Sequence, residues 1–496
     1  MASGTGWQTV AACAIAVAQV ACARAAAGAA AGVDAAVDVA QLAEDATQVD
    51  VFAADATADT ALIPPPVARA PSALALQDIV GLSSHPALGA EPAAVKERAF
   101  EWNAMKQLGI HRLRTDFRFS AIEPQPAVWD FSAYDPLVSE AAAHGVNLLA
   151  LLDATAPWAT PVVNAGDGYP PKDPQDFATF AAKVADRYKA TVSEYEVWNE
   201  PNNGVTFWKA DQFAGEPDKY AALFLLANQD IHAAQPTAQV AFGAILYHFI
   251  VSSGPEFLAN ALQATPALAA AIGVFSLHPY PLYPPVSSPE SAVGDEVPLP
   301  TQIATMNGLL AAAGASTATV PFWLTELGWS TTSQLTPAQQ ARYTVRAVVL
   351  SALAGADRLY LYTLLDDANA FGAEGDFGLM TPGDVTGTGS GIPPQPKPAF
   401  VALQTLLQTV GGFHVAAQVP QPGAPGAWLV RLEQAGQVAC VAWRTEDATT
   451  PTTVQLPFGG KVRVTQLDGT FHDDAAAAGN YVVAVGADPV IVTQRQ

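Results

Sequence analysis

Residues 194–203 read EYEVWNEPNN, an apolar, strand-like run that ends in Glu200 among aromatic and amide side chains. Residues 323–329 read WLTELGW and place Glu326 in a similar setting. Two carboxylates on separate strands of one rigid scaffold are what acid-assisted cleavage of a glycosidic bond requires. The two stretches therefore predict a sugar-cleaving site, provided that the fold brings the glutamates together.

Around these stretches, short β-branched runs alternate with long amphipathic runs between residues 71 and 410. We expect strands at 79–82, 111–116, 146–153, 194–199, 240–246, 274–278, 322–325 and 358–362. We expect helices at 92–107, 134–144, 174–188, 217–234, 255–271, 300–313, 337–354 and 397–410, several with proline in the first turn. Eight strand–helix pairs predict an α/β fold, a (β/α)8 TIM barrel. The alternative, an open doubly wound sheet, would be expected to show a glycine-rich phosphate turn, and none is present.

The two ends of the chain differ from this pattern. Residues 411–496 contain short alternating runs separated by Gly, Pro and Asp, which predict a small C-terminal antiparallel β-sandwich. Its role is either packing against the barrel or binding carbohydrate. Residues 25–70 are rich in Ala and Asp and end near a triple proline, so we expect a disordered N-terminal linker.

Residues 1–24 contain an apolar run too short for a confident membrane span, and we interpret them as a signal peptide. Cys22 follows Val20-Ala21 in a loose lipobox-like pattern, so it is either a lipid-anchor site or an incidental cysteine near the cleavage point. With Cys13 and Cys22 in this segment, only Cys440 remains, and no intramolecular disulfide can form in the mature chain. We expect a bacterial protein that is secreted or held at the cell envelope, without a transmembrane span in the mature chain.

Composition restricts the partners. The formal net charge of −23 argues against nucleic acid, anionic membrane surfaces and polyanionic substrates as electrostatic partners. The eight histidines are scattered without an HExxH motif, and no GxSxG elbow is present, so we expect neither a metal nor another cofactor. The expected partner is an oligo- or polysaccharide, bound by a monomer.

If the barrel forms, Glu200 closes strand four and Glu326 closes strand seven. The ends of these strands face each other across the barrel mouth, so opposed carboxylates are geometrically natural. A separation of about 5–5.5 Å would imply a retaining double displacement. The alternative for each glutamate taken alone is a surface salt bridge.

These motifs resemble those of clan A glycoside hydrolases, above all family 39 and related bacterial endo-glycosidases that cleave exopolysaccharide. The resemblance spans roughly residues 78–410 and includes weaker matches at 113–117, 122–124, 129–131, 276–280 and 397–400. It implies that Glu200 is the acid/base and Glu326 the nucleophile of a retaining β-glycosidase. Family β-xylosidases usually carry Glu-Phe-Asn where this chain has Glu326-Leu327-Gly328, which favours an endo-acting polysaccharide hydrolase over an exo-acting xylosidase.

Several side chains could support this chemistry. Asn199 could donate to a sugar 2-hydroxyl or cap its strand. Arg114 could hold Glu326 ionised or form an ion pair with Asp116. His278 and Tyr280 could orient the nucleophile and a sugar hydroxyl, or serve as a buried structural pair.

Aromatic side chains are natural platforms for the C–H faces of sugars. Trp158, Trp208 and Trp329 all follow strand ends, and each is either such a platform or part of the core. Inserts at 164–172, 283–298 and 366–396, with Tyr283 and Phe371, would form the cleft walls. The remaining alternative to an enzyme is a non-catalytic surface carbohydrate-binding protein, although pure binding would not need both glutamates.

Overall fold

The computed structural model describes residues 63–162, 168–209, 215–249, 251–282, 285–316, 319–370, 372–385, 391–446, 452–456, 458, 460–476 and 480–495. The expected signal peptide, the linker up to residue 62, Tyr283 and Phe371 lie outside these residues. Within the described part of the chain, no helix is both long enough and apolar enough to cross a membrane.

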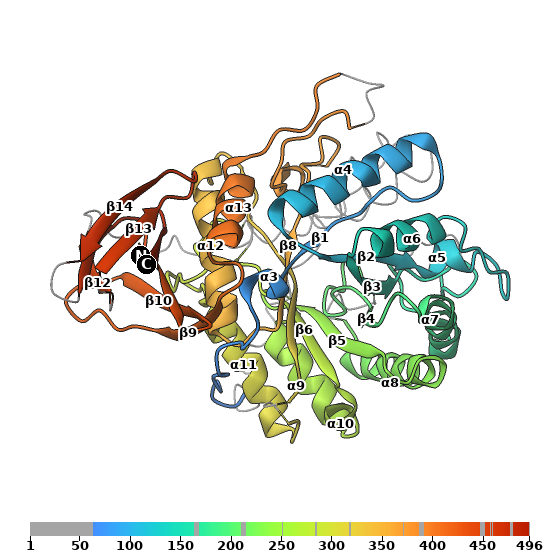
Figure 1. Cartoon of the computed structure of the whole chain (residues 1–496). Coiled ribbons are helices and arrows are strands. Elements are labelled where there is room, and N and C mark those ends of the chain that lie inside the picture. The colour runs from blue at the N-terminus through green and yellow to red at the C-terminus, as the bar shows by residue number, and fades with distance from the viewer. Residues whose placement is uncertain are drawn as a thin grey trace, which may run out of the picture.

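Eight parallel strands form a closed barrel in chain order, and β8 pairs with β1 to close it (Figure 1). The predicted (β/α)8 barrel is therefore confirmed. The strands are β1 (Val80–Ser83), β2 (Arg112–Arg118), β3 (Asn147–Asp153), β4 (Glu194–Val197), β5 (Gln239–Leu246), β6 (Val274–His278), β7 (Phe322–Leu327) and β8 (Arg358–Tyr362). The main surrounding helices are α4 (Pro92–Leu108), α6 (Asp135–Ala143), α7 (Pro174–Tyr188), α8 (Pro217–Ala234), α9 (Gly254–Ala264), α11 (Leu299–Ala312), α12 (Pro337–Leu353) and α13 (Pro398–Val410).

The short elements are the ones that the sequence pattern missed. They are α3 (Leu76–Ile79), α5 (Phe119–Ile122), α10 (Leu268–Ala271) and the 3-10 turn η2 (Gly372–Asp376). The helix expected at 255–271 is divided into α9 and α10, and Pro266, which lacks a backbone N–H, lies between them. Strand β4 stops at Val197 rather than Asn199 because Trp198 has a φ of 69°, outside the extended region.

Side chains fill the barrel in layers of different chemistry. A central apolar layer contains Leu149, Ala241, Val274, Trp323 and Tyr360. At the amino ends of the strands, Arg112 and Arg358 both pair with Glu194, at 3.0 and 3.6 Å. The layer above the apolar one, toward the carboxyl ends, is again charged, and it supports the candidate site described below.

The C-terminal part forms two antiparallel sheets, as predicted. The larger has the order β14-β13-β16-β11-β10-β9 and the smaller pairs β12 with β15. Their bounds are β9 (His414–Gln418), β10 (Ala427–Gln434), β11 (Gln437–Arg444), β12 (Thr452–Leu456), β13 (Gly460–Thr465), β14 (Phe471–Ala476), β15 (Tyr481–Val485) and β16 (Val490–Arg495). Strand β14 is not one of the alternating runs from which the sandwich was predicted, because its sequence, FHDDAA, has no apolar alternation; the side chains of residues 471–475 are exposed.

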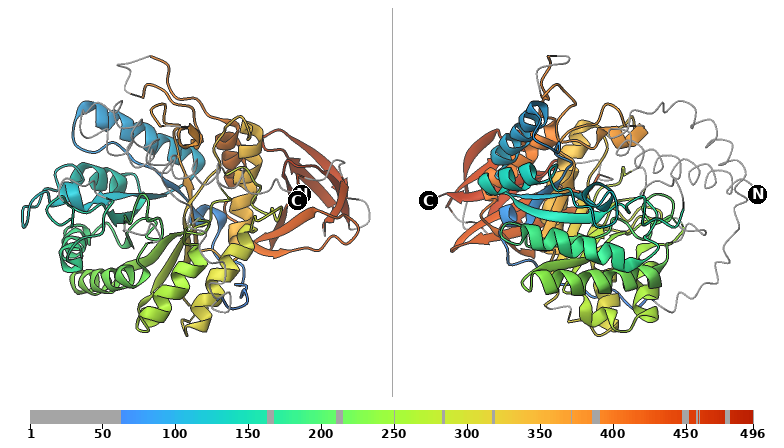
Figure 2. Two further views of the ribbon diagram at one scale, coloured as in Figure 1. Left: turned by 180° about the vertical axis from the view of Figure 1, so that it is seen from behind. Right: turned by 90° about the vertical axis from the view of Figure 1, so that its right-hand side faces the viewer.

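The larger sheet uses both of its faces. Cys440, Val462 and Val492 on one face share a core with β12 and β15. Val441 and Ile491 on the other face belong to the same apolar cluster as the barrel core. Helices α12 and α13 lie between the strands of the barrel and this sheet (Figures 1 and 2). The thiol of Cys440 is fully buried, and burial raises its pKa to about 12, so it is an inert packing group.

A buried ion pair joins the sheet to the barrel. Arg346 of α12 lies 2.6 Å from Glu290, in the segment before α11, and both side chains are buried. Trp443 of β11 donates its indole N–H to the same carboxylate at 3.2 Å. Arg346 also donates to the carbonyl of Arg444 at 3.2 Å. We call these contacts the Arg346–Glu290 junction.

Residues 63–70 correct the predicted extent of the linker, which was placed at 25–70. Val67 N–H donates to the carbonyl of Ala304 in α11 at 2.8 Å. Arg69 donates to Asn307 at 3.2 Å and to the carbonyl of Gly355 at 3.1 Å. Composition does not show that a side chain meets buried acceptors in α11 and in the turn after α12, which is why this segment was predicted to be disordered.

Candidate active site

Glu200 follows β4 in a tight backbone arrangement. Trp198 N–H donates to Leu152 of β3 at 2.8 Å, and Glu200 N–H donates to Ala244 beyond the midpoint of β5 at 3.1 Å. Glu200 has a φ of 42°, in the left-handed region that non-glycine residues rarely adopt. The backbone therefore turns its side chain into the barrel mouth, where only 7% of the residue is exposed.

The carboxyl group of Glu200 has two polar neighbours. Asn203 donates its amide N–H to Oε2 at 3.0 Å. The Nδ1 of His278, at the end of β6, lies 3.0 Å from Oε1. Burial raises the pKa of Glu200 to about 7, although the Asn203 hydrogen bond and the charge of Arg114 act in the opposite direction. This group therefore keeps its proton to a higher pH than an exposed glutamate does.

His278 links the two glutamates. Its ring is fully buried, and burial lowers its pKa to about 4, so the imidazole is neutral near pH 7. Nδ1 lies 3.0 Å from Glu200 and 3.7 Å from Glu326. Nε2 has no hydrogen-bond partner among the described residues, so the single ring proton is best placed on Nδ1, where it donates to Glu200.

Glu326 lies near the end of β7, within a register shift between Leu324 and Leu327. Leu324 pairs with Leu359 and Leu327 with Leu361, so the β7 side holds one extra residue. This bulge re-aims Glu326 toward the mouth. Arg114 donates to its Oε1 at 2.5 Å, and the hydroxyl of Tyr280 donates to its Oε2 at 3.1 Å. Burial and the nearby charge of Glu326 raise the pKa of Tyr280 well above its usual value, so the phenol keeps its proton.

The residue after Leu327 must be glycine. A Cβ added at Gly328 would lie 2.1 Å from the carbonyl oxygen of Tyr362, at the end of β8. The Leu-Gly-Trp sequence that distinguishes this chain from family β-xylosidases therefore allows β7 and β8 to approach closely beside Glu326.

Arg114 organises the charged layer. Its Nε donates to Glu196 at 2.6 Å, its Nη1 to Glu326, and its Nη2 to the Oδ1 of Asn199 at 2.8 Å. Burial disfavours its charge, but the carboxylates of Glu196 and Glu326 outweigh this and raise its pKa. The predicted alternative partner, Asp116, instead lies 3.0 Å from the Nδ1 of His85.

Glu196 is the functional residue that sequence reasoning missed. It is fully buried and occupies the inward position two residues before Trp198. The sequence could have revealed it. Glu194 and Glu196 alternate in a fully buried strand, and buried carboxylates of this kind need a cation as a partner inside the barrel. Asn199 accepts through Oδ1 from Arg114, which leaves its amide N–H groups to donate elsewhere.

The predicted tryptophan platforms fare differently. Trp208 and Trp329 are each only 1% exposed, which makes them core residues and excludes them as sugar platforms in this structure. Their indole N–H groups donate to Glu216 at 3.2 Å and to the carbonyl of Ser287 at 2.8 Å. Trp158 is partly exposed, donates to the carbonyl of Glu123 at 2.8 Å, and remains a candidate.

A different aromatic group surrounds the carboxylates. Tyr362 at the end of β8 lies 5.4 Å from Phe377, and Phe377 lies 6.0 Å from Tyr280, measured between ring centroids. The ring of His85 lies 6.3 Å from that of Tyr362. Tyr362 is partly exposed, so it is a candidate aromatic contact for a sugar that the sequence analysis did not predict.

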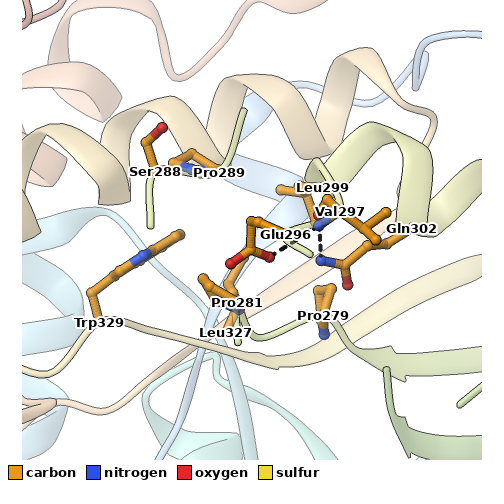
Figure 3. A pocket seen from close by; sticks show the side chains of 10 residues that line it. All are labelled: Pro279, Pro281, Ser288, Pro289, Glu296, Val297, Leu299, Gln302, Leu327 and Trp329. Carbon is orange, nitrogen blue, oxygen red and sulfur yellow. Dashed lines mark hydrogen bonds between the residues drawn. The ribbon is translucent and has the colours of Figure 1, made fainter. Parts of the chain in front are cut away.

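A small cavity lies behind the site (Figure 3). Its volume is about 10 Å³, and its lining includes Leu327, Trp329, Glu296 and Gln302. The Oε1 of Gln302 has no hydrogen-bond partner within the described part of the chain. A space of this size holds at most one water molecule, so it is a packing cavity and not a substrate pocket.

Side-chain oxygens of Glu200 and Glu326 and a ring nitrogen of His278 all lie within 4.8 Å of one another. Among the described residues this is the one group that could hold a metal ion. The guanidinium of Arg114 already contacts Glu326, however, and a cation would compete with it. The arrangement of Glu200, His278 and Glu326 therefore suits two catalytic carboxyl groups better than a metal centre.

Comparisons with known proteins agree with the predicted resemblance at the level of the fold. No family model matches the chain, and no curated protein matches it. Among solved structures, it is similar to a family 39 glycoside hydrolase from Bacteroides cellulosilyticus WH2, with 18% identity, a TM-score of 0.65, and coverage of 85% of this chain and 82% of that one.

Two further structures share the fold. A monomeric β-xylosidase from Caulobacter crescentus CB15 is 18% identical, with a TM-score of 0.57 and coverage of 86% of this chain and 97% of that one. A family 30 endoxylanase from Clostridium papyrosolvens C71 is 11% identical, with a TM-score of 0.56 and coverage of 87% and 99%. The likeness in fold to these solved glycoside hydrolases therefore extends beyond the barrel into the C-terminal sheets.

Proposed function

We propose that this protein is a retaining glycoside hydrolase that cleaves β-linked glycans by double displacement. The observation that carries the proposal is the spacing of Glu200 and Glu326, whose facing oxygens lie within 4.8 Å. Carboxyl groups about 5–5.5 Å apart characterise retaining enzymes, whereas inverting enzymes need roughly 6.5–9.5 Å to admit a water molecule. The likeness of the fold to glycosidases from two families supports the same conclusion.

The two environments support separate roles. Glu200, with its pKa raised to about 7 by burial, can protonate the leaving oxygen and then, once ionised, activate water. Glu326 is fixed by a guanidinium and a phenol and can attack the anomeric carbon. Neutral His278 orients Glu200 without adding charge between the two carboxylates.

The neighbouring groups would act on the sugar itself. Arg114 donates to the Oδ1 of Asn199, so the amide N–H groups of Asn199 remain as donors for a sugar 2-hydroxyl. Such a contact strengthens as the ring acquires oxocarbenium character. Tyr362 could then present a ring face to the same sugar.

We further propose endo action on a polysaccharide and export of the protein. The absence of the xylosidase Glu-Phe-Asn sequence supports the first proposal. One structurally similar protein is described as a conserved exported protein from Bacteroides fragilis, at 14% identity and a TM-score of 0.57, which supports the second. Product analysis on a β-linked polymer tests endo action, because an exo enzyme would release only monosaccharide or a single short product from the outset.

Trapping with a 2-deoxy-2-fluoro glycosyl fluoride, followed by peptide mapping, tests the mechanism. We expect a covalent adduct on Glu326, and none in the Glu326→Gln variant. Turnover of an aryl β-glycoside should persist in the presence of EDTA. Binding of glycan by wild type, Glu200→Gln and Glu326→Gln alike, with no release of reducing ends, would instead identify a carbohydrate-binding protein.

A further inference from the structure

A second cavity lies between α13 and the larger C-terminal sheet. Beyond their apolar contact the two elements separate and leave a space of about 400 Å³. Its lining includes Gln408 of α13, Gln437 of β11, and Thr493 of β16. This volume falls in the range of roughly 300–1,000 Å³ that ligand sites occupy.

The cavity is remote from Glu200 and Glu326. It is lined by the carboxyl-terminal half of α13 and by Phe413, whose carbonyl accepts a hydrogen bond from Leu76 N–H just before β1. That is the end of the barrel where the strands begin, whereas the two glutamates lie where the strands end. The space therefore cannot be an extension of the proposed active site.

The lining has the opposite charge to the rest of the chain. The described residues that line it include two arginines, Arg463 and Arg495, and no carboxylate. The whole chain has a formal net charge of −23, so a cavity lined by cations and uncharged polar groups is a local exception. Amides and hydroxyls on Gln408, Gln437 and Thr493 supply both donors and acceptors.

The two arginines are held differently. Arg463 donates to both oxygens of Asp473, at 2.7 and 2.9 Å, and lies 3.7 Å above the ring of Phe471. The side chain of Arg495 makes no hydrogen bond or ion pair with the described residues and is exposed, although its charge acts on the Asp473 carboxylate that Arg463 already binds. Phe471 is itself 56% exposed. One guanidinium thus fixes an aromatic ring, and the other can receive a ligand.

We propose that this cavity is a second glycan site that takes an acidic saccharide, a unit that carries a uronic-acid carboxylate. Arg495 would pair with the carboxylate, in the geometry that guanidinium groups favour. The amides and the threonine hydroxyl would bind ring hydroxyls, and the uncovered face of Phe471 would contact the C–H face of a sugar. Such a site would hold the protein on a polymer independently of the reaction.

Binding to the full chain carrying Glu326→Gln tests this inference without turnover. The probes are xylotetraose bearing one 4-O-methylglucuronic acid and unsubstituted xylotetraose, which differ only in the acidic unit, and the measurement is isothermal titration calorimetry. We expect the acidic probe to bind at least about tenfold more tightly, because a carboxylate–arginine pair is among the stronger polar contacts.

Arg495→Gln should then weaken the acidic probe by about tenfold. Gln408→Ala, on the barrel side of the cavity, should weaken both probes. The matched control is Lys189→Gln, which removes the same charge from an exposed position directly after α7, a helix on the opposite side of the barrel from the C-terminal sheet (Figure 1), and it should change affinity by less than about twofold.

Three outcomes would overturn the inference. Equal weakening by Arg495→Gln and Lys189→Gln would show unspecific charge attraction. Unchanged binding in Arg495→Gln and Gln408→Ala would place the probe at the barrel mouth alone. No preference for the acidic probe would remove the acidic ligand class. None of these results depends on catalysis, so the proposed hydrolase activity would stand or fall separately.

Discussion

Arg114 and Glu196 form an ion pair of 2.6 Å inside the barrel, where the two side chains are 1% and 0% exposed. A buried pair of this kind adds little net stability, but loss of one partner leaves an uncompensated charge. Its value here is geometric, because the same guanidinium also holds Glu326 and Asn199. The pair fixes the direction in which both side chains face the mouth.

The first prediction follows from that geometry. Arg114→Lys keeps the positive charge but loses the planar guanidinium group, whose nitrogens donate to Glu196, Glu326 and Asn199 at once. We expect kcat/KM for an aryl β-glycoside to fall on the order of 10²-fold or more, by analogy with loss of one preorganised donor. Wild-type kinetics in this variant, with a normal circular dichroism spectrum, would show that the guanidinium group of Arg114 has no positioning role.

The second prediction concerns the pH dependence of activity. Burial raises the pKa of Glu200 to about 7, and the acid must be protonated to assist the leaving group. We expect kcat/KM to fall about tenfold per pH unit above roughly pH 7. Asn203 lowers this pKa by donating to the carboxylate, so Asn203→Ala should move the basic limb to higher pH. A limb that stays in place would exclude Asn203 as a determinant.

The third prediction concerns stability. The folded pKa of Glu200, about 7, exceeds the usual glutamate pKa of 4.5, so folding disfavours ionisation. The stability associated with the protonated group is complete below about pH 4.5 and is lost as pH rises through about 7. The free energy of unfolding of Glu200→Gln relative to wild type should therefore increase by about 3 kcal/mol between about pH 4 and pH 8. Urea titrations at both pH values measure this difference, and a constant difference would contradict it.

The fourth prediction concerns Gly328. A Cβ there would meet the Tyr362 carbonyl at 2.1 Å, and backbone atoms cannot move away cheaply. Gly328→Ala should destabilise the protein by at least about 1–3 kcal/mol, the usual cost of overpacking. Gly273→Ala is the matched control, since no atom lies within 4 Å of its added Cβ. Equal midpoints in urea for the two variants would contradict the close approach of β7 and β8.

The fifth prediction separates core aromatics from surface ones. Trp208→Phe removes a buried indole hydrogen bond and should lower the free energy of unfolding by about 1–3 kcal/mol, with little change in KM. Tyr362→Ala should instead raise KM by roughly tenfold, since aromatic contacts contribute about 0.5–1.5 kcal/mol beyond burial. The reverse pattern would restore Trp208 as a platform.

The sequence predicted correctly those features in which a residue type occurs in few structural environments. The eight strands followed from apolar runs, and Glu200 and Glu326 were recognised because glutamate after a buried strand needs a reason. It was less informative about side-chain direction. Trp208 and Trp329 follow strand ends as Tyr362 does, and only the path of the backbone shows that the first two point inward.

Local backbone conformation was the second feature that the sequence did not reveal. The left-handed φ values of Trp198 and Glu200 end β4 early, and no residue in WNEPN signals them by itself. Glu196 was overlooked for a different reason: its partner, Arg114, lies on another strand 82 positions away. Such pairs become visible only when the barrel register is known.

The Arg346–Glu290 junction affects whether the barrel can be separated from the C-terminal sheets by truncation. The larger sheet shares one continuous apolar core with the barrel, through residues such as Val441 and Ile491, and the buried charge of Arg346 is met from the barrel and the sheet together. Cutting the chain after α13 would leave that core open to water and Arg346 without its acceptors from the sheet. The two parts thus behave as one unit of folding, and a barrel transplanted alone into another protein would carry an unfinished surface.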